Sequence, residues 1–431
     1  MPRGLVMTML VFSLHTTCKI FGPVIRETPY DKSSAARLTA GKPWVICSAY
    51  MRYLNSFVGR LIRVCVLLVS IVVSSFAWAD PSDAVLDLTH AKVKDVLAVQ
   101  KAFTADLMNE PEVLGTAVGL SEAGEPALVI YVDQDGKGAS EVVRALPPQL
   151  RGVAVRAHLT DKFRAVKGNP HGGGGSGVSH TAKQTPPIQL GTSGGWRNDL
   201  ANGYCCGGTL GSLIKISGGP SNQLQFILSN YHVLEADIVK GGNGIVATTG
   251  SPVIQPGLVD VNCNANNAQN VGTLVKLSSL PNNNVDCAVA QVISGMVRTD
   301  GAILEIGTLS SQTVAASLSQ LVKKSGRTTK LSHSHISGLN ATVSVAYDNE
   351  CAGGPAFTKT FTGQIVIANS GSAFLNSGDS GSLMVEDVPT NPRAVGLLYA
   401  GSSTSAIANP INAVLQFLGS KLGGTATMVG Q

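Results

Sequence analysis

Three residues of this chain carry the side chains of a nucleophilic hydrolase, and they occur in the order His232, Asp286, Ser380. A serine hydroxyl is a weak nucleophile at neutral pH until an imidazole removes its proton. The imidazole in turn needs a carboxylate that fixes its tautomer and stabilises its cation. The sequence therefore predicts that three distant segments meet, with His232 as general base, Asp286 as orienting carboxylate and Ser380 as nucleophile.

The residues around Ser380 form the glycine-rich sequence Gly-Asp-Ser-Gly-Ser at 378–382. A tight turn there would let the backbone N–H groups of Gly378 and Ser380 point at one place. Such a pair of donors stabilises the oxyanion of a tetrahedral intermediate, and losing one donor costs on the order of 10² to 10³ in rate. Gly378 and Ser380 are therefore the predicted oxyanion hole, although glycine, aspartate and serine are also common in ordinary turns.

The chain order and local sequence of the three residues argue against two other classes of serine hydrolase. An α/β-hydrolase needs a histidine after its serine, but the last histidine is His335, before Ser380. A subtilisin-type order could recruit Asp199 ahead of His232, but that nucleophile heads a helix, and no helical start signal follows Ser380. The order His, Asp, Ser is the one that remains.

The same residues resemble the chymotrypsin/trypsin-like serine proteases, in which the nucleophile lies in a Gly-Asp-Ser-Gly turn and the aspartate opens an Asp-x-Ala strand, here 286–288. Segments 325–329, 207–211 and 408–411 are similar to a bacterial subgroup typified in plants by the narrow-leaf protein. The resemblance implies a mainly β fold, a chymotrypsin-like double antiparallel β-barrel with a C-terminal helix. It implies peptide-bond hydrolysis through an acyl-enzyme, without metal or organic cofactor.

The resemblance also implies a substrate pocket. Its floor residue would be Phe374, six positions before Ser380, and one wall would be the strand that contains Tyr399, Ala400 and Gly401. Because the floor position holds no acidic residue, a preference for Lys or Arg is not supported, and an uncharged substrate side chain is expected.

Two rival interpretations involve other residues. Asp260 also lies between His232 and Ser380, but it occurs in turn-like sequence, whereas Asp286 begins an alternating apolar stretch. His333 and His335 could suggest a metal pair, but no third ligand occurs at fitting spacing. We therefore expect Asp286 in the triad and no metal site.

The chain divides into five parts. We predict a doubtful upstream segment at 1–50, a signal peptide at 51–79, a small α/β domain at 80–166, a Gly/Pro-rich linker at 167–187 and the protease domain at 188–431. The glycine run in the linker is not a phosphate loop, because no Gly-Lys-Ser/Thr follows it. The α/β domain carries no catalytic constellation and is expected to be a prosegment, folding aid, inhibitory module or structural appendage.

The signal peptide is predicted from three arginines before the apolar run 64–73 and from the Ala-x-Ala site at 77–79. The apolar run is shorter than the roughly 18 residues of a spanning helix, so cleavage is expected rather than a membrane anchor. Met51 would be a natural initiator methionine, so we expect that residues 1–50 result from a start codon assigned too far upstream. The mature protein is then secreted or periplasmic, with no stable membrane span.

Removing residues 1–79 also changes the charge argument. That segment holds nine Lys/Arg and two Asp/Glu, so residues 80–431 hold 23 basic and 25 acidic residues, a net charge of −2 in place of +5. A basic balance would have favoured a nucleic-acid or anionic membrane partner. The remaining chain gives no such indication, and protein or peptide substrates are the expected partners.

Apolar periodicity predicts the elements. The small domain should contain a helix within 85–107, strands at 117–119 and 127–132, a short helix near 141–145 and a strand at 153–155. The larger domain repeats short β-prone runs between Gly, Asn and Ser clusters, at 209–216, 225–229, 272–277, 285–292, 341–347, 364–368, 383–385 and 394–399. A C-terminal helix is predicted at 410–418.

Five cysteines remain after residue 79, namely Cys205, Cys206, Cys263, Cys287 and Cys351. Export permits disulfides, and an odd count leaves one thiol unpaired unless chains cross-link. Cys287, inside an apolar strand, is the expected buried free thiol. We therefore predict an exported serine endopeptidase; the alternative is a catalytically silent protease fold that serves as a binding or scaffolding module.

Overall fold

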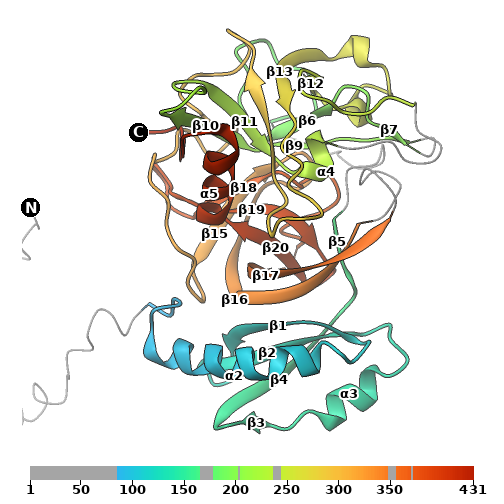
Figure 1. Ribbon diagram of the computed structural model, residues 1–431, viewed down its shortest axis with the longest axis vertical. Helices are drawn as coiled ribbons and strands as arrows, with labels where there is room; N and C mark the ends of the chain where they lie inside the picture. The colour runs from blue at the N-terminus through green and yellow to red at the C-terminus, as the bar shows by residue number, and fades with distance from the viewer. Residues whose placement is uncertain (1–84, 166–177, 202–203, 236–243, 348–355, 370–371) are drawn as a thin grey trace, which may run out of the picture. The chain divides into compact units, whose positions relative to one another are not determined.

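The computed structural model describes residues 85–165, 178–201, 204–235, 244–347, 356–369 and 372–431 (Figure 1). The chain forms two units, Met1–Trp78 and Ala79–Gln431, and all described residues belong to the second unit. The upstream segment predicted at 1–50, the signal peptide at 51–79 and linker residues 167–177 lie outside the described residues. Among the described residues, none of the helices combines the length and apolar character that crossing a membrane requires.

The first described segment is a small α/β unit. Its elements are α2 (Ala91–Leu107), β1 (Val113–Leu120), β2 (Pro126–Asp133), α3 (Ala139–Ala145), β3 (Gln149–Leu150) and β4 (Val153–Thr160). Strand β2 pairs antiparallel with β1 and parallel with β4. Helix α2 buries Val93, Val96 and Val99 against this sheet, which follows from their helical spacing. The element types predicted from periodicity are confirmed here.

An eight-stranded antiparallel sheet follows, in the order β21-β10-β11-β14-β13-β12-β6-β9. Its strands are β6 (Thr192–Trp196), β9 (Gly208–Leu210), β10 (Ser212–Ser217), β11 (Gln225–Ser229), β12 (Pro252–Gln255), β13 (Gln269–Val275), β14 (Ala288–Val292) and β21 (Thr425–Met428). Phe226, Ile227 and Leu228 on β11 are buried in its core. The described residues also form a small β7–β8 pair (Leu200–Ala201, Tyr204–Cys205), a one-turn helix α4 (Tyr231–Leu234) and the 3₁₀ turns η2 (Leu258–Asp260) and η3 (Ala265–Asn267).

A second set of six strands closes on itself. These are β15 (Leu321–Gly326), β16 (Lys330–Tyr347), β17 (Phe357–Ala368), β18 (Leu383–Glu386), β19 (Ala394–Gly401) and β20 (Ser405–Pro410). Their order is β15-β18-β19-β20-β17-β16, and β15 also pairs with β16, which completes the ring. Closure removes exposed sheet edges. The predicted mainly β architecture of two antiparallel sheets is therefore confirmed.

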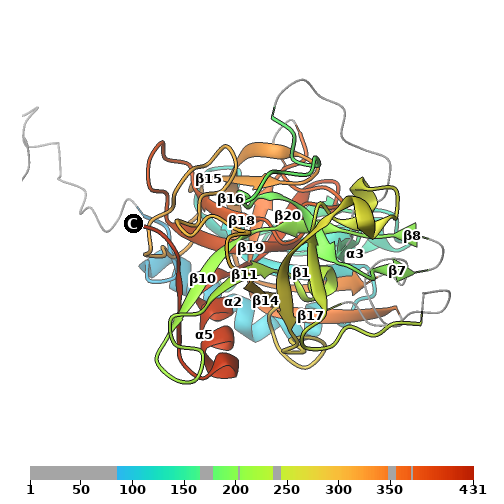
Figure 2. The ribbon, with the colours of Figure 1, turned by 90° about the horizontal axis from the view of Figure 1, so that it is seen from above.

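The predicted C-terminal helix is present as α5 (Ile411–Leu422), which begins after Pro410 and ends at Gly423, whose φ of 74° suits glycine. It contacts β19 and β20 of the ring and β21 of the eight-stranded sheet (Figures 1 and 2). Its buried residues, among them Val414 and Leu418, therefore pack where the two sheets meet.

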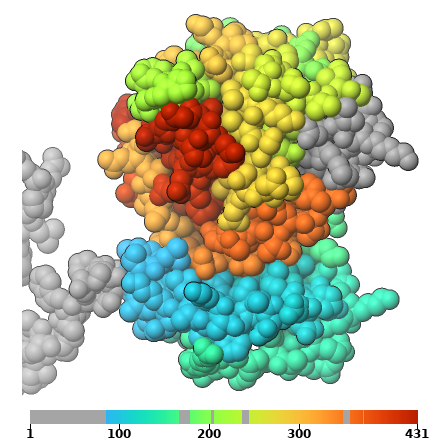
Figure 3. All heavy atoms as spheres, in the orientation of Figure 1, coloured from blue at the N-terminus to red at the C-terminus, as the bar shows by residue number. Residues whose placement is uncertain are grey.

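The α/β unit joins the ring through backbone pairing. Strand β1 pairs antiparallel with β16, with Gly115 opposite Val343, so one sheet runs from the ring into the small unit. Figure 3 shows the small unit, in blue to green, packed directly against the orange strands of the ring. The Gln100 side chain reaches across, donating to the Asn340 carbonyl oxygen at 2.9 Å. Together, the β1–β16 pairing and the Gln100 hydrogen bond hold the small unit against the ring. Sequence patterns did not indicate this packing.

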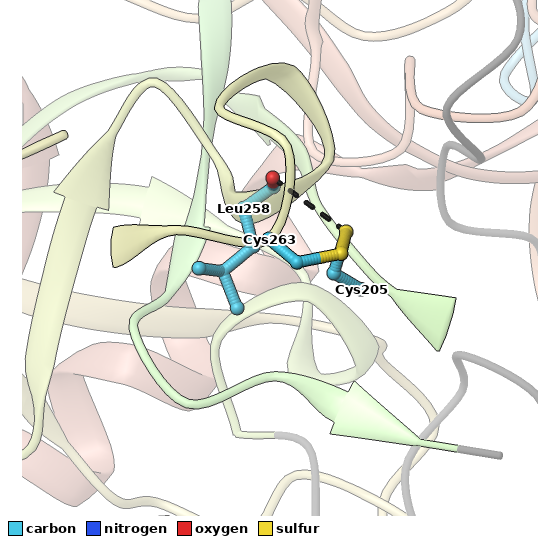
Figure 4. Close-up of a disulfide and its surroundings, with 3 residues drawn as sticks. All are labelled: Cys205, Leu258 and Cys263. Carbon is cyan, nitrogen blue, oxygen red and sulfur yellow. Dashed lines mark hydrogen bonds between the residues drawn. A yellow bond between two sulfur atoms is a disulfide. The ribbon is translucent and has the colours of Figure 1, made fainter. Parts of the chain in front are cut away.

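A disulfide connects Cys205 and Cys263, which are 58 residues apart in sequence, and the Cys205 sulfur lies 3.6 Å from the Leu258 carbonyl oxygen (Figure 4). Cys206 is also disulfide-bonded. Cys287 is the free cysteine of the described residues, and it is fully buried. The prediction of a buried free thiol at Cys287 is confirmed.

Candidate active site

His232 and Asp286 form a buried pair between the two sheets. His232 lies in α4, immediately after β11, and Asp286 lies two residues before β14; both side chains are inaccessible to solvent. The His232 Nδ1 atom is 2.7 Å from Asp286 Oδ2. The backbone N–H of Tyr231 donates to Asp286 Oδ1 at 2.8 Å. A carboxylate held in this way can fix the imidazole tautomer, which is the role predicted for it.

Tyr347 is a third donor to the same carboxylate, and sequence reasoning did not find it. Its hydroxyl donates to Asp286 Oδ2 at 2.8 Å. Burial and the nearby Asp286 charge raise the pKa of the Tyr347 hydroxyl well above its ordinary value, so it stays a donor at neutral pH. No local sequence motif predicts this role for Tyr347, because Tyr347 contacts Asp286 only as a result of how β16 packs in the fold.

Ser380 lies close to the His232 segment. A Cβ atom placed on Gly208 would be 2.6 Å from Val233 Cγ2 and 3.0 Å from the Ser380 carbonyl oxygen, so Val233 and Ser380 flank the same glycine. The Ser380 hydroxyl donates to the Tyr399 carbonyl oxygen at 3.3 Å. Within the described residues, His232 Nε2 has no hydrogen-bond partner. The Ser380 hydroxyl and His232 Nε2 therefore do not hydrogen-bond to each other in this structure.

The turn around Ser380 has the backbone conformation that its glycines allow. Gly378 and Gly381 have φ angles of 95° and 93°, which residues with a Cβ rarely adopt. A Cβ on Gly381 would lie 2.3 Å from the Thr209 carbonyl oxygen. In the part of the chain that the structure describes, the backbone N–H groups of Gly378 and Ser380 are not among the hydrogen-bond donors. Their role in an oxyanion hole stays a prediction.

Asp379, between Gly378 and Ser380, is fixed by a dense set of donors. Its carboxylate accepts from the backbone N–H groups of Thr328 (2.8 Å), Thr329 (3.0 Å) and Asn376 (3.0 Å). The buried Lys324 ammonium lies 3.4 Å from it. Desolvation lowers the pKa of Lys324, and the Asp379 charge opposes that shift. The Ser-Gly-Arg-Thr-Thr sequence at 325–329, which suggested only a subgroup, thus helps to hold the turn that contains Asp379 and Ser380.

Asp260, the rival carboxylate, has a different partner. Arg327 donates to it from Nε at 2.9 Å and from Nη2 at 2.7 Å, and Ser193 donates to it at 2.5 Å. Both ends of this ion pair are largely buried. Two parallel N–H···O bonds between guanidinium and carboxylate are a strong, directional contact. Asp260 therefore ties η2 to the β15–β16 turn, and Asp286 is the carboxylate that contacts His232.

A cavity of about 340 Å³ opens beside the loop that leads to Ser380, at Asn376 and Ser377. It is lined by Asp161, Arg164, Asn369, Ala373, Leu375, Asn376, Ser377, Gly401, Ser402 and Ser403. Gly401 is the one predicted pocket residue among them. Phe374 packs into the hydrophobic core with Leu398 and is 1% exposed, while Tyr399 and Ala400 are fully buried. Phe374, the predicted floor residue, does not line the cavity, because its ring is buried in the core. Its sequence neighbours Ala373 and Leu375 line the cavity.

His333 and His335 were considered as a possible metal-binding pair. His333 Nδ1 lies 2.8 Å from Asp387 Oδ2 at the surface, on β16. No group of three or more metal-binding side chains occurs within the described residues.

Comparisons with known proteins give structural neighbours only. No family model matches the chain, and no curated protein matches it. Thermobifida fusca Protease A is 19% identical, with 57% of this chain and 99% of that chain covered and a TM-score of 0.36. A Cellulomonas bogoriensis chymotrypsin is 20% identical, with coverages of 57% and 99% and a TM-score of 0.33.

A Nocardiopsis protease is 15% identical, with 52% of this chain and 92% of that chain covered and a TM-score of 0.33. None of these three is a narrow-leaf protein, so the similarity to that subgroup stays a prediction. One of these three solved structures is described as a chymotrypsin and the other two as proteases.

Proposed function

We propose that this protein is an exported serine endopeptidase that uses His232, Asp286 and Ser380. The observation that carries the proposal is the buried 2.7 Å contact between His232 Nδ1 and Asp286 Oδ2, with Ser380 in a Gly-Asp-Ser-Gly turn beside the histidine segment. A buried imidazole–carboxylate pair next to a serine hydroxyl is the arrangement that activates a nucleophile.

The proposed reaction begins with a rotation of the Ser380 side chain. Its hydroxyl leaves the Tyr399 carbonyl oxygen and turns toward His232 Nε2, which accepts the proton as Ser380 Oγ bonds to the peptide carbonyl carbon. The oxyanion accepts hydrogen bonds from the N–H groups of Gly378 and Ser380. His232 then gives the proton to the leaving amine, and the C–N bond breaks. Water, deprotonated by His232, hydrolyses the acyl-enzyme and restores Ser380.

The proposed substrates are proteins or peptides. Neutral residues supply most of the cavity lining, including Ala373 and Leu375 next to the nucleophile loop, which favours an uncharged substrate side chain. The net charge of −2 for residues 80–431 gives no support for a nucleic-acid partner. The predicted signal peptide and the Cys205–Cys263 disulfide support a secreted or periplasmic location, since disulfides persist in oxidising compartments.

One observation favours the second candidate, a protease fold that serves as a binding or scaffolding module. The strand β5 (Phe163–Ala165), at the end of the α/β unit, pairs with both β16 and β19. Asp161 and Arg164 from this segment line the cavity. The segment 161–165 would therefore cover part of the cleft in which a substrate of the endopeptidase would bind.

Labelling with a serine-directed fluorophosphonate separates the two candidates. Endopeptidase function predicts that Ser380 is modified in the wild type and not in Ser380→Ala. The matched control is Ser382→Ala, which alters a buried serine of the same turn whose hydroxyl donates to the Asp379 carbonyl oxygen. If the protein is never labelled, even after the linker has been cut, the endopeptidase proposal fails and the binding module is favoured.

A further inference from the structure

Tyr347 lies in the same buried cluster as the imidazole and the carboxylate. It ends β16, is 1% exposed and stacks on Phe357 with ring centroids 4.6 Å apart and an interplanar angle of 3°. Its ring meets the His232 ring edge-on, at 5.9 Å and 74°. The aromatic packing fixes the ring, and the ring aims its hydroxyl at Asp286.

The contact uses the same carboxylate oxygen as His232. Asp286 Oδ2 accepts from His232 Nδ1 at 2.7 Å and from the Tyr347 hydroxyl at 2.8 Å, while Oδ1 accepts from the Tyr231 backbone N–H. Hydrogen bonds to a charged partner are stronger than those between neutral groups. With donors on both oxygens, rotation of the carboxylate would break at least one bond.

Among the described residues, no charged side chain other than His232 is found in an ion pair with Asp286. The Tyr399 ring is buried nearby, and its hydroxyl has no hydrogen-bond partner among the described residues. The Cys287 thiol is buried, so it stays neutral. Glu235, the other acid that acts on Cys287, accepts from the backbone N–H groups of Leu277 and Ser278.

We infer that Tyr347 is a positioning residue for the proposed hydrolysis: its hydroxyl holds the Asp286 carboxylate so that His232 keeps its Nδ1–H toward Asp286 and its Nε2 free to accept a proton. This inference rests on the proposed function. It deepens that function by adding a residue from β16, a strand that supplies none of the triad. The residue acts through Asp286 and does not contact the reacting atoms.

Tyr347→Phe tests the inference, because it removes the hydroxyl and keeps the ring that packs on Phe357. We expect kcat of the exported protein on an activated ester or peptide substrate to fall about 10- to 100-fold, which corresponds to one hydrogen bond to a charged group. KM should change by less than about twofold. The matched control is Tyr131→Phe, which removes another buried tyrosine hydroxyl, one that makes no hydrogen bond to the described residues. Its kcat should stay within about twofold of wild type.

A double-mutant cycle distinguishes positioning from a general loss of packing. In the Asp286→Ala background the carboxylate is absent, so adding Tyr347→Phe should lower the residual kcat by less than about twofold. If Tyr347 contributes packing alone, the second substitution lowers kcat as much in this background as in the wild type, and the inference is overturned.

A measurement without turnover completes the test. In proton NMR of the full chain, the resonance of the His232 Nδ1 proton should be sharp in the wild type and broadened in Tyr347→Phe, because a freed carboxylate lets this proton exchange faster with water. An unchanged resonance together with an unchanged kcat overturns the inference. If the wild type neither turns over substrate nor reacts with fluorophosphonate, the proposed function fails, while the resonance still reports on Tyr347.

Discussion

Arg164 and Gly401 face each other across an antiparallel bridge that joins β5 to β19, the strand whose Tyr399 carbonyl oxygen accepts from the Ser380 hydroxyl. On its other side β5 runs parallel to β16, with Ala165 opposite Tyr347. An extended peptide commonly binds by adding a strand to a sheet. Strand β5 occupies this side of β19 at Gly401. A peptide substrate of the proposed endopeptidase that paired with β19 there would have to displace it.

Cutting the linker should therefore raise activity. A site for a sequence-specific protease, inserted within 167–177, allows the α/β unit to separate from the cleft after cleavage. We expect the rate of fluorophosphonate labelling at Ser380 to rise at least about tenfold. This change corresponds to the loss of about 1.4 kcal/mol of free energy that favours the covered site. Equal rates before and after cleavage would show that β5 does not obstruct the site.

Asp161→Ala should weaken the same blockage without a cut. The Asp161 carboxylate accepts from the backbone N–H of Ser403 at 2.7 Å and from the Ser403 hydroxyl. Because this contact is exposed to solvent, its loss should raise the labelling rate of the intact chain only about two- to fivefold. Asp135→Ala, at an exposed position of the same unit away from the cavity, is the control and should leave the rate unchanged.

The two candidate carboxylates should respond differently to the same substitution. Asp286→Asn is expected to lower kcat about 10⁴-fold, because the amide favours the wrong imidazole tautomer. Asp260→Asn leaves the Arg327 guanidinium buried and incompletely paired, so it should reduce the free energy of unfolding by about 3–5 kcal/mol. Steady-state kinetics and urea unfolding of both variants would check this, and the reverse pattern would assign the triad to Asp260.

The Lys324–Asp379 pair should stabilise the turn that carries Ser380. Both side chains are fully buried, so Lys324→Met leaves the Asp379 charge without its cation. We expect a loss of about 3–5 kcal/mol in the free energy of unfolding. The double variant Lys324→Met/Asp379→Asn removes both charges and should recover part of that loss. Additive losses in urea unfolding would mean that the two side chains are not coupled.

Cys287 should make stability fall at alkaline pH. Burial, with smaller effects from the Asp286 and Glu235 charges, raises the pKa of its thiol well above 9.0. The unfolded chain then releases this proton near pH 9 and the folded chain retains it. The stabilisation is therefore complete below pH 9 and is lost as the pH rises toward the folded pKa.

Urea unfolding at pH 8 and pH 10 checks this expectation. Relative to Cys287→Ala, the wild type should lose up to about 1.4 kcal/mol per pH unit above 9. Parallel curves for the two proteins would contradict a buried, protonated thiol.

The sequence by itself determined the local chemistry. The glycines at 378 and 381 predict a turn because only glycine readily adopts its positive φ angles. The apolar run 226–228 predicts the strand before His232, and the alternating apolar residues predict antiparallel sheets. The position of the last histidine, His335, before Ser380 argued against an α/β-hydrolase. Each of these inferences depends on residue types within a few positions, or on chain order alone.

The tertiary structure alone decided the contacts between residues far apart in sequence. Tyr347 reaches Asp286 across 61 positions, and β5 inserts between β16 and β19. Strands 341–347 and 364–368 were predicted as short runs, whereas β16 and β17 extend much farther, because cross-strand pairing continues through polar residues. Packing, rather than local pattern, also buried Phe374 and left Ala373 and Leu375 to line the cavity. Such contacts depend on how the sheets close and pack, which no local pattern encodes.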